Sequence, residues 1–161
     1  MTGITGKVVI DCGIVSDLID IASQCQPCGV DLTVGKIEFF VNHGVIDFDN
    51  SRRQLPKTVD AGMQYVYDAD CYLVTFNETI SCPPDCYGVI YPRSSLLRMG
   101  ADLRGTIIDP GYKGKCQSML VVHTIDGLKI LPNAKVAQVV FTKLEQPAEK
   151  LYNGIYQNEN L

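Results

Sequence analysis

The sequence predicts an all-β domain, and three observations support this fold class. Apolar and polar residues alternate along residues 31–41, 63–76 and 135–144, which is the period-two pattern of strands with one buried face. Shorter apolar stretches, separated by the Gly, Pro, Asn and Asp residues that turns require, occupy residues 87–91, 105–109, 118–124 and 128–132. Helical periodicity is confined to short segments. Many short strands with little helix indicate a sandwich, a jelly roll or a barrel.

Two segments have helical character. Residues 16–23 favour a weak turn of helix, and residues 94–99 favour one short helix. Ser94 or Ser95 can cap the start of this helix, and Gly100 can end it. The polar residues at the C-terminus carry scattered tyrosines, so we expect residues 150–161 to form a flexible tail on a single domain spanning residues 1–161.

Composition and charge bound the function. With 161 residues, 46% of them hydrophobic and 20% charged, the chain is long enough for one well-packed domain. A net charge of −4 argues against general nucleic-acid binding, which depends on neutralising phosphates with Lys and Arg. The sequence has neither a run of ~20 apolar residues nor the apolar core of a signal peptide. We therefore expect a cytoplasmic protein that does not bind membranes.

The chain has seven cysteines, an odd number. Without an export signal, free thiols are the first interpretation. Two close pairs, Cys25 with Cys28 and Cys82 with Cys86, leave structural zinc and a disulfide as alternatives. Zinc is disfavoured because the second pair is separated by Pro-Pro-Asp and no further Cys or His pair follows at a typical spacing.

The segment YPRSSLLRMG, residues 91–100, places cationic and hydroxyl side chains at the start of the expected helix. Unpaired backbone N–H groups and the helix dipole favour anions at such a position. Between residues 93 and 115 the chain carries five of its fourteen basic residues, Arg93, Arg98, Arg104, Lys113 and Lys115. This concentration favours a polyanionic ligand; a capped surface helix with solvated arginines is the alternative.

The segment GTIIDPGYKG, residues 105–114, delivers Asp109 to the end of an apolar strand, where Pro110 and Gly111 turn the chain. An aspartate at this position can act as a general base toward water. An ordinary Asp-Pro-Gly turn is the alternative interpretation.

In this order the segments resemble the superfamily of deoxyuridine triphosphatases and deoxycytidine triphosphate deaminases. The resemblance rests on PCGVDLTVG (27–35), YPRSSLLRMG (91–100), GTIIDPGYKG (105–114), NAKVAQVVF (133–141) and YNGIYQ (152–157). It implies a distorted jelly-roll β-barrel with one short helix. It further implies a homotrimer with active sites between subunits and a Mg²⁺-bound deoxynucleoside triphosphate as the ligand.

The same resemblance implies roles for individual residues. Asp109 would be the catalytic residue that activates water, and Asp31 would hold Mg²⁺ through water. Tyr112 would lie against the deoxyribose. The implied substrate-binding residues are Arg93, Ser94, Ser95, Arg98, Tyr112, Gln138, Tyr156 and Gln157. Uracil would be recognised by backbone groups within residues 116–128.

The resemblance also bears on which reaction is catalysed. Deaminases of this superfamily use a glutamate on the strand after the third motif, and here Met119 occupies its place. A thioether cannot move protons at neutral pH, so we expect dUTP to be hydrolysed to dUMP and pyrophosphate. A dCTP deaminase or bifunctional enzyme and a non-catalytic nucleotide-binding regulator are the alternatives. The sequence departs from triphosphatases in carrying Ser95 where they usually have glycine, and from the deaminase-type tail in carrying Ile155 instead of lysine.

Overall fold

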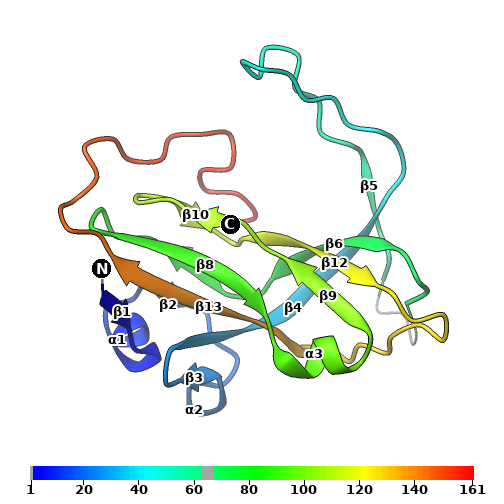
Figure 1. Cartoon of the computed structure of the whole chain (residues 1–161), viewed down its shortest axis with the longest axis horizontal. Coiled ribbons are helices and arrows are strands. Elements are labelled where there is room, and N and C mark those ends of the chain that lie inside the picture. Colours follow the sequence, from blue (N-terminus) through cyan, green and yellow to red (C-terminus); the bar gives the residue numbers. More distant parts are fainter. Residues whose placement is uncertain (1, 63–66) are drawn as a thin grey trace.

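The computed structural model describes residues 2–62 and 67–161, which form a curled, antiparallel β-structure with three short helices (Figure 1). The helices are α1 (Gly6–Asp11), α2 (Ile21–Gln24) and α3 (Ser94–Arg98). The strands are β1 (Thr2–Ile4), β2 (Val15–Ser16), β3 (Cys25–Gln26), β4 (Gly29–Phe40), β5 (Thr58–Asp60), β6 (Cys71–Phe76), β7 (Thr79–Ser81), β8 (Cys86–Pro92), β9 (Ala101–Arg104), β10 (Ile107–Ile108), β11 (Lys113–Gly114), β12 (Gln117–Val122) and β13 (Lys135–Lys143). The predicted all-β fold class is confirmed.

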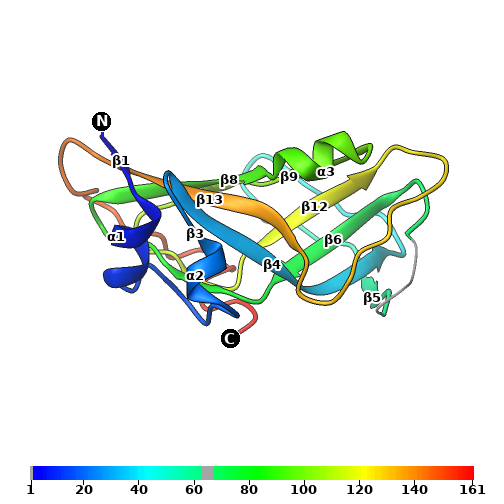
Figure 2. The same cartoon turned by 90° about the horizontal axis from the view of Figure 1, so that it is seen from below.

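The strands of the described residues form two sheets. The ten-stranded sheet follows the order β10-β8-β13-β4-β6-β12-β9, with β1 added to β13 and with β3 and β5 added to β4. A small sheet has the order β11-β7-β2. In Figure 2, α1 and α2 lie near one end of the large sheet, whereas α3 lies on the opposite side beside β9.

The core is built mainly from the large sheet. Buried side chains alternate along much of β8 and β13, whereas the first six residues of β4 are all buried. In β12 the burial alternates strictly, so that Ser118, Leu120 and Val122 face inward. Gly29, at the start of β4, is required by close packing, because a Cβ atom there would collide with the carbonyl oxygen of Val139. Backbone approach of this kind is a usual reason for glycine in a strand.

The strand predictions succeed where alternation is long. Residues 31–41, 87–91, 118–124 and 135–144 correspond to β4, β8, β12 and β13. The predicted strand 63–76 is correct for β6, while residues 63–66 lie outside the described residues. The prediction for residues 128–132 is wrong. Leu128 pairs only through an isolated bridge with Tyr67, and a turn follows in which the Ala134 N–H donates to the Leu131 carbonyl and Asn133 has φ 58°.

Helix α3 forms at the predicted place and ends at Arg98 with Met99 as its C-cap, and Gly100 follows with a φ of 75° that suits glycine. The predicted serine cap is wrong. The N-cap is Arg93, no side chain caps the helix, and both Ser94 and Ser95 are exposed. Helix α2 (Ile21–Gln24) covers the last part of the expected helical segment, residues 16–23, and begins after Asp20, whose side chain accepts a hydrogen bond from the Ala22 N–H. Helix α1 was not predicted, since its six residues are too few to show a period.

Two segments leave the sheet and return to it. An arm, residues 41–57 between β4 and β5, rises away from the sheet in cyan in Figure 1. The C-terminal segment, residues 150–161, runs back toward β10 in red. No helix of the described residues has the length and apolar character needed to cross a bilayer.

Candidate active site

The first group of predicted site residues surrounds Asp31, in the middle of the large sheet. Gln138 on β13 lies directly opposite Asp31 on β4, and Tyr91 on β8 is the neighbour of Gln138 on its other side. Arg93 follows the last residue of β8 at the same level. Antiparallel pairing therefore brings the first, second and fourth motifs together, and Asp31, Arg93 and Gln138 lie as the family resemblance implied.

Asp31 is buried and surrounded by donors. Its Oδ2 atom lies 3.2 Å from Nε of Arg93 and 3.8 Å from Nζ of Lys135. The side chains of Gln138 and Gln26 also donate to the Asp31 carboxyl, over 3.4 and 3.3 Å. Burial raises the pKa of Asp31, and the charges of Arg93 and Lys135 act against this rise. Asp31 thus orients the cationic side chains that surround it.

These contacts bear on whether Asp31 fits a directly bound Mg²⁺ ion. Mg²⁺ prefers free oxygen ligands and keeps several waters, whereas the Asp31 carboxyl is buried and already bonded to two cations. In the described part of the chain no three His, Cys, Asp or Glu side chains gather as a metal-binding group. The residues of this chain therefore do not fit a directly coordinated magnesium site at Asp31.

The second group of predicted site residues is organised by the turn after β10. Asp109 is exposed, and its carboxyl makes no hydrogen bond or ion pair with the described residues. The chain turns at Gly111, whose φ is 86°, and the Tyr112 N–H donates to the Asp109 carbonyl over 3.1 Å. Asp109 therefore stands on a short, closed turn, with a carboxyl group that is free to contact a ligand or water.

Tyr112 is buried beneath the C-terminal segment. Its ring meets that of Tyr152 edge to face, with centroids 5.7 Å apart. Its hydroxyl donates to Oε1 of Glu159 over 2.7 Å. Burial raises the pKa of both Tyr112 and Glu159, while the hydrogen bond from Tyr112 acts against the rise at Glu159. Burial also raises the pKa of the neighbouring Cys116 thiol to about 12, so this thiol is not a nucleophile at neutral pH.

The C-terminal segment is held against the third motif by polar contacts. The Gln157 amide bridges this motif, accepting from the Lys113 N–H and donating to the Gly111 carbonyl. Further along, the Asn158 N–H donates to the Lys113 carbonyl and the Lys115 N–H donates to the Glu159 carbonyl. Of the tail residues predicted for the site, Gln157 thus contacts the Asp109 turn directly.

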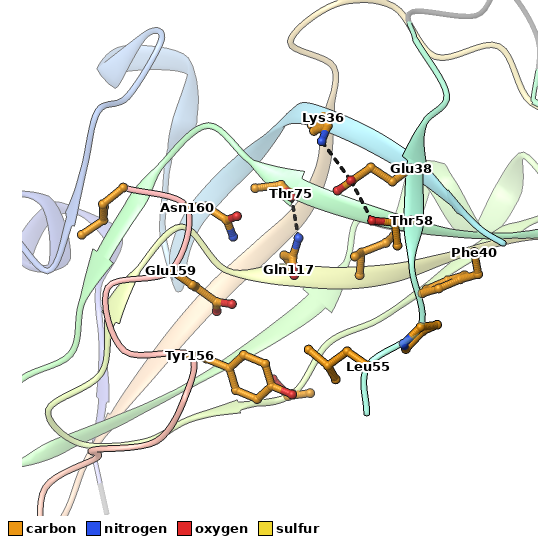
Figure 3. A pocket seen from close by; sticks show the side chains of 14 residues that line it. Lys36, Glu38, Phe40, Leu55, Thr58, Thr75, Gln117, Tyr156, Glu159 and Asn160 are labelled. Atoms are coloured by element: carbon orange, nitrogen blue, oxygen red, sulfur yellow. Dashed lines mark hydrogen bonds and ion pairs between the residues drawn. The ribbon is translucent and has the colours of Figure 1, made fainter. Parts of the chain in front are cut away.

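A cavity of about 480 Å³ lies between the turn and the C-terminal segment. Its lining includes Asp109, Tyr112 and Tyr156, together with Gln117 at the start of β12. An adjoining cavity of about 850 Å³ shares Gln117, Tyr156 and Glu159 with it. Figure 3 shows this larger cavity, with the Gln117 amide bonded to Thr75 and with Tyr156 and Glu159 entering from the C-terminal segment.

One chain does not bring the two groups together. Ile108 pairs with Gly88 near the start of β8, so Asp109 lies at that end, whereas Arg93 follows the other end. The separation is about five residue steps along β8, or roughly 16 Å. Ser94, Ser95 and Arg98 accompany Arg93 on α3, where all three are exposed.

The basic residues that are concentrated between positions 93 and 115 do not form one patch. Arg93 pairs with Asp31, whereas Arg104 lies 3.6 Å from Asp102 on β9. None of the five basic residues of that segment is among the described residues that line the Asp109 cavity. These residues are therefore close together in the sequence but not in the folded chain.

Sequence reasoning missed several residues of both groups. Lys135 and Gln26 join the Asp31 group, and Arg53 and Glu159 line the Asp109 cavity. Lys135 stands in the fourth motif, three positions before Gln138, so its charge could have been noticed. Arg53 and Glu159 lie in segments without a pattern, and no local signal distinguishes them.

No disulfide joins the cysteines, and in the part of the chain that the structure describes none of them belongs to a group of three or more potential metal ligands. All seven carry free thiols, with Cys82, Cys86 and Cys116 buried and Cys12, Cys28 and Cys71 exposed. Of the close pair, Cys25 lies in β3 and Cys28 lies in the turn between β3 and β4.

Comparison with known proteins places the chain in a family. A sequence model of the dCTP deaminase-like family matches residues 7–144. The chain is 39% identical over 151 residues to a probable deoxyuridine 5'-triphosphate nucleotidohydrolase of Methanosarcina barkeri, covering 91% of this chain and 88% of that protein. It is 37% identical over 139 residues to the deoxyuridine 5'-triphosphate nucleotidohydrolase of Methanocaldococcus jannaschii, covering 83% and 87%.

The fold has a counterpart among solved structures. The 2'-deoxycytidine 5'-triphosphate deaminase of Agrobacterium tumefaciens superimposes with a TM-score of 0.66 at 18% identity, a likeness of fold alone. The match covers 86% of this chain and 47% of that one, so the chain spans about half the length of the deaminase. On the extent of the sequence matches, the chain belongs to the dCTP deaminase-like family.

Proposed function

We propose that the protein is a cytoplasmic dUTP diphosphatase that hydrolyses dUTP to dUMP and pyrophosphate. The observation that carries the proposal is the free carboxyl of Asp109, which lines a cavity. On the neighbouring strand β12, Met119 stands where a deaminase needs an acid. The names of the relatives from Methanosarcina barkeri and Methanocaldococcus jannaschii support the choice of substrate.

In the proposed reaction Asp109 accepts a proton from a water molecule as the water oxygen attacks the α-phosphorus. The bond from the α-phosphorus to the bridging oxygen breaks, and pyrophosphate leaves. Arg93, Ser94, Ser95, Arg98 and Gln138 hold phosphate oxygens and stabilise the charge that develops on them. Tyr112 supports the deoxyribose, while Tyr156 and Gln157 close the site from the C-terminal side. Magnesium enters as part of the Mg²⁺–dUTP substrate, held by phosphate oxygens and water.

The roughly 16 Å between Asp109 and Arg93 along β8 supports a site shared between copies of the chain. A homotrimer in which one subunit supplies Asp109 and its neighbour supplies Arg93 would place both at one triphosphate. Closed cyclic symmetry makes every such contact equivalent. We therefore propose a homotrimer with composite active sites.

The catalytic assignment is tested with Asp109→Asn. We expect this variant to bind dUTP with unchanged affinity while kcat for pyrophosphate release falls by about 10²- to 10⁴-fold, the usual contribution of a general base. Glu145→Gln, which removes an exposed acid from the segment after β13, is the matched control and should keep full activity. Unchanged turnover in Asp109→Asn would remove Asp109 from the mechanism.

The composite site is tested by mixing two inactive variants. Arg93→Gln retains Asp109, and Asp109→Asn retains Arg93, so subunits exchanged between them create sites with both residues intact. Random exchange in a trimer with sites between neighbours restores about a quarter of the sites. Activity that does not return after dissociation and reassembly of the mixture would show that each site is built from one chain.

A further inference from the structure

The arm, residues 41–57, has a defined course that carries it to the Asp109 cavity. Val45 and Gln54 exchange two backbone hydrogen bonds of 2.8 and 2.9 Å across its base. At its tip the Asp47 carboxyl accepts from the Arg52 N–H and from the Ser51 hydroxyl. These bonds fix the backbone next to Arg53 and thus the direction in which the Arg53 side chain projects from the arm.

Arg53 enters the cavity that contains Asp109. Its guanidinium lies over the ring of Tyr156, 5.9 Å from the centroid, within the range of a cation–π contact. Among the described residues that line this cavity, Arg53 is the single cationic side chain, and it stands with two acids, Asp109 and Glu159. It forms no ion pair with any residue that the structure describes.

This combination differs from a solvated surface arginine. A carboxylate within reach would ordinarily be its partner, yet the Glu159 carboxyl is bonded to the Tyr112 hydroxyl and Asp109 remains apart. The aromatic contact holds the guanidinium without using its in-plane donors. A guanidinium presents several N–H donors in a planar fork that matches phosphate oxygens. Because Asp109 and Glu159 would repel a polyanion that enters this cavity, such a ligand needs a cation like Arg53 to offset the repulsion.

We propose that Arg53 binds phosphate oxygens of a nucleoside triphosphate in the Asp109 cavity. The proposal rests on the proposed function for the identity of the ligand, and adds the arm to the substrate-binding residues. The Tyr156 ring then has two tasks, since it lines the cavity and supports the guanidinium. The arm supplies the charge of Arg53, and the C-terminal segment supplies the Tyr156 ring on which the guanidinium packs.

The test compares Arg53→Gln with Arg52→Gln, which removes the neighbouring, exposed arginine of the same arm. Binding of inorganic tripolyphosphate and of deoxyuridine, which carries no phosphate, is measured by calorimetry, and circular dichroism verifies folding. We expect Arg53→Gln to weaken tripolyphosphate binding by about 10- to 100-fold, the usual effect of losing a hydrogen bond to a charged group. Its affinity for deoxyuridine should stay unchanged, and Arg52→Gln should bind both ligands as the wild type does.

A second variant separates charge from local structure. Ile155 also lines the cavity, so Ile155→Lys in the Arg53→Gln background returns a cation to it. We expect tripolyphosphate affinity to recover by about tenfold. A double variant as weak as Arg53→Gln would overturn the proposal, as would equal losses in the two arginine variants or a parallel loss of deoxyuridine and tripolyphosphate binding.

Turnover of dUTP on the same samples distinguishes the two proposals. If the wild type binds tripolyphosphate through Arg53 but releases no pyrophosphate from dUTP, the proposed function fails and the role of Arg53 stands. If the wild type hydrolyses dUTP, and Arg53→Gln does so with unchanged KM and kcat, the proposed function stands and the role of Arg53 is refuted.

Discussion

Glu78, which follows β6, provides a stringent test of how the fold supports the Asp31 group. Its side chain is fully buried, and the carboxyl accepts three hydrogen bonds. Oε1 accepts from the Gln24 amide over 2.7 Å and from the Thr33 hydroxyl over 2.6 Å, and Oε2 accepts from the Thr33 N–H over 2.9 Å. The Gln24 amide also donates to the carbonyl of Asp31 itself. Glu78 thus joins α2 to the segment of β4 that carries Asp31.

The cost of removing this carboxyl follows from the three donors it satisfies. In Glu78→Ala these buried donors lose their acceptor, and each unmade bond costs about 1–3 kcal/mol. Because the Gln24 amide keeps its bond to Asp31 and the three terms are not additive, we expect a loss of about 3–6 kcal/mol in the free energy of unfolding. Glu78→Gln keeps the volume and one acceptor oxygen, so its loss should be about 1–2 kcal/mol.

Thermal unfolding measures this loss, which corresponds to a fall in Tm of about 10–20 °C for Glu78→Ala in a chain of this size. The matched control is Glu38→Gln. Glu38 is also largely buried, but its partners Lys36 and Thr58 lie at the edge of the larger cavity (Figure 3), and the expected loss is below about 1 kcal/mol. Equal stabilities for Glu78→Ala and the wild type would refute the view that this network holds β4 in place.

Three further predictions follow from the described contacts. First, Glu159→Gln should raise the Tm at pH 7. Burial raises the pKa of Glu159 above its ordinary value of 4.5. The stabilisation that protonated Glu159 contributes is therefore complete below pH 4.5 and is lost as the pH rises through the raised pKa. Calorimetry at about pH 4 should give the same Tm for Glu159→Gln and the wild type, and a lower Tm for the variant at pH 7 would contradict the argument. Second, dCTP should remain unaltered in a chromatographic assay because Met119 cannot transfer protons, and any uracil-containing product would refute this. Third, brief alkylation of the folded protein followed by mass spectrometry should modify Cys12, Cys28 and Cys71. It should spare Cys82, Cys86 and Cys116, because burial raises their pKa values to about 12, 11 and 12; rapid labelling of these three would contradict the burial.

Much of the fold could be predicted because its central strands are long and alternate. β4 and β13 show the period of two directly, and Gly100 marks the end of α3 as its positive φ requires. The meeting of Asp31, Arg93 and Gln138 was predicted only through the family resemblance. Strand pairing explains the meeting, but a single sequence does not reveal which strands pair or in which register.

The failed predictions have equally local causes. Residues 128–132 look like a strand because they are apolar, but Leu131, Pro132 and Asn133 form a turn that leaves only Leu128 bridged to Tyr67. The contribution of Arg53 depends on an arm whose path is set by contacts at its tip and base. Glu159 gains its importance from the buried Tyr112, 47 positions away in the chain.

The geometry of Arg93 indicates how a buried aspartate would serve the proposed phosphate binding. Arg93 uses Nε for Asp31 and Nη1 for the Lys135 carbonyl, so one edge of its guanidinium is anchored to the sheet. An anchored guanidinium loses less side-chain entropy when it binds a ligand than a free arginine does. Burial makes the ionised form of Asp31 costly, and the cations Arg93 and Lys135 offset that cost. In the proposed function Asp31 therefore acts on the ligand through Arg93, so that an acid can lie at the centre of the proposed polyanion site.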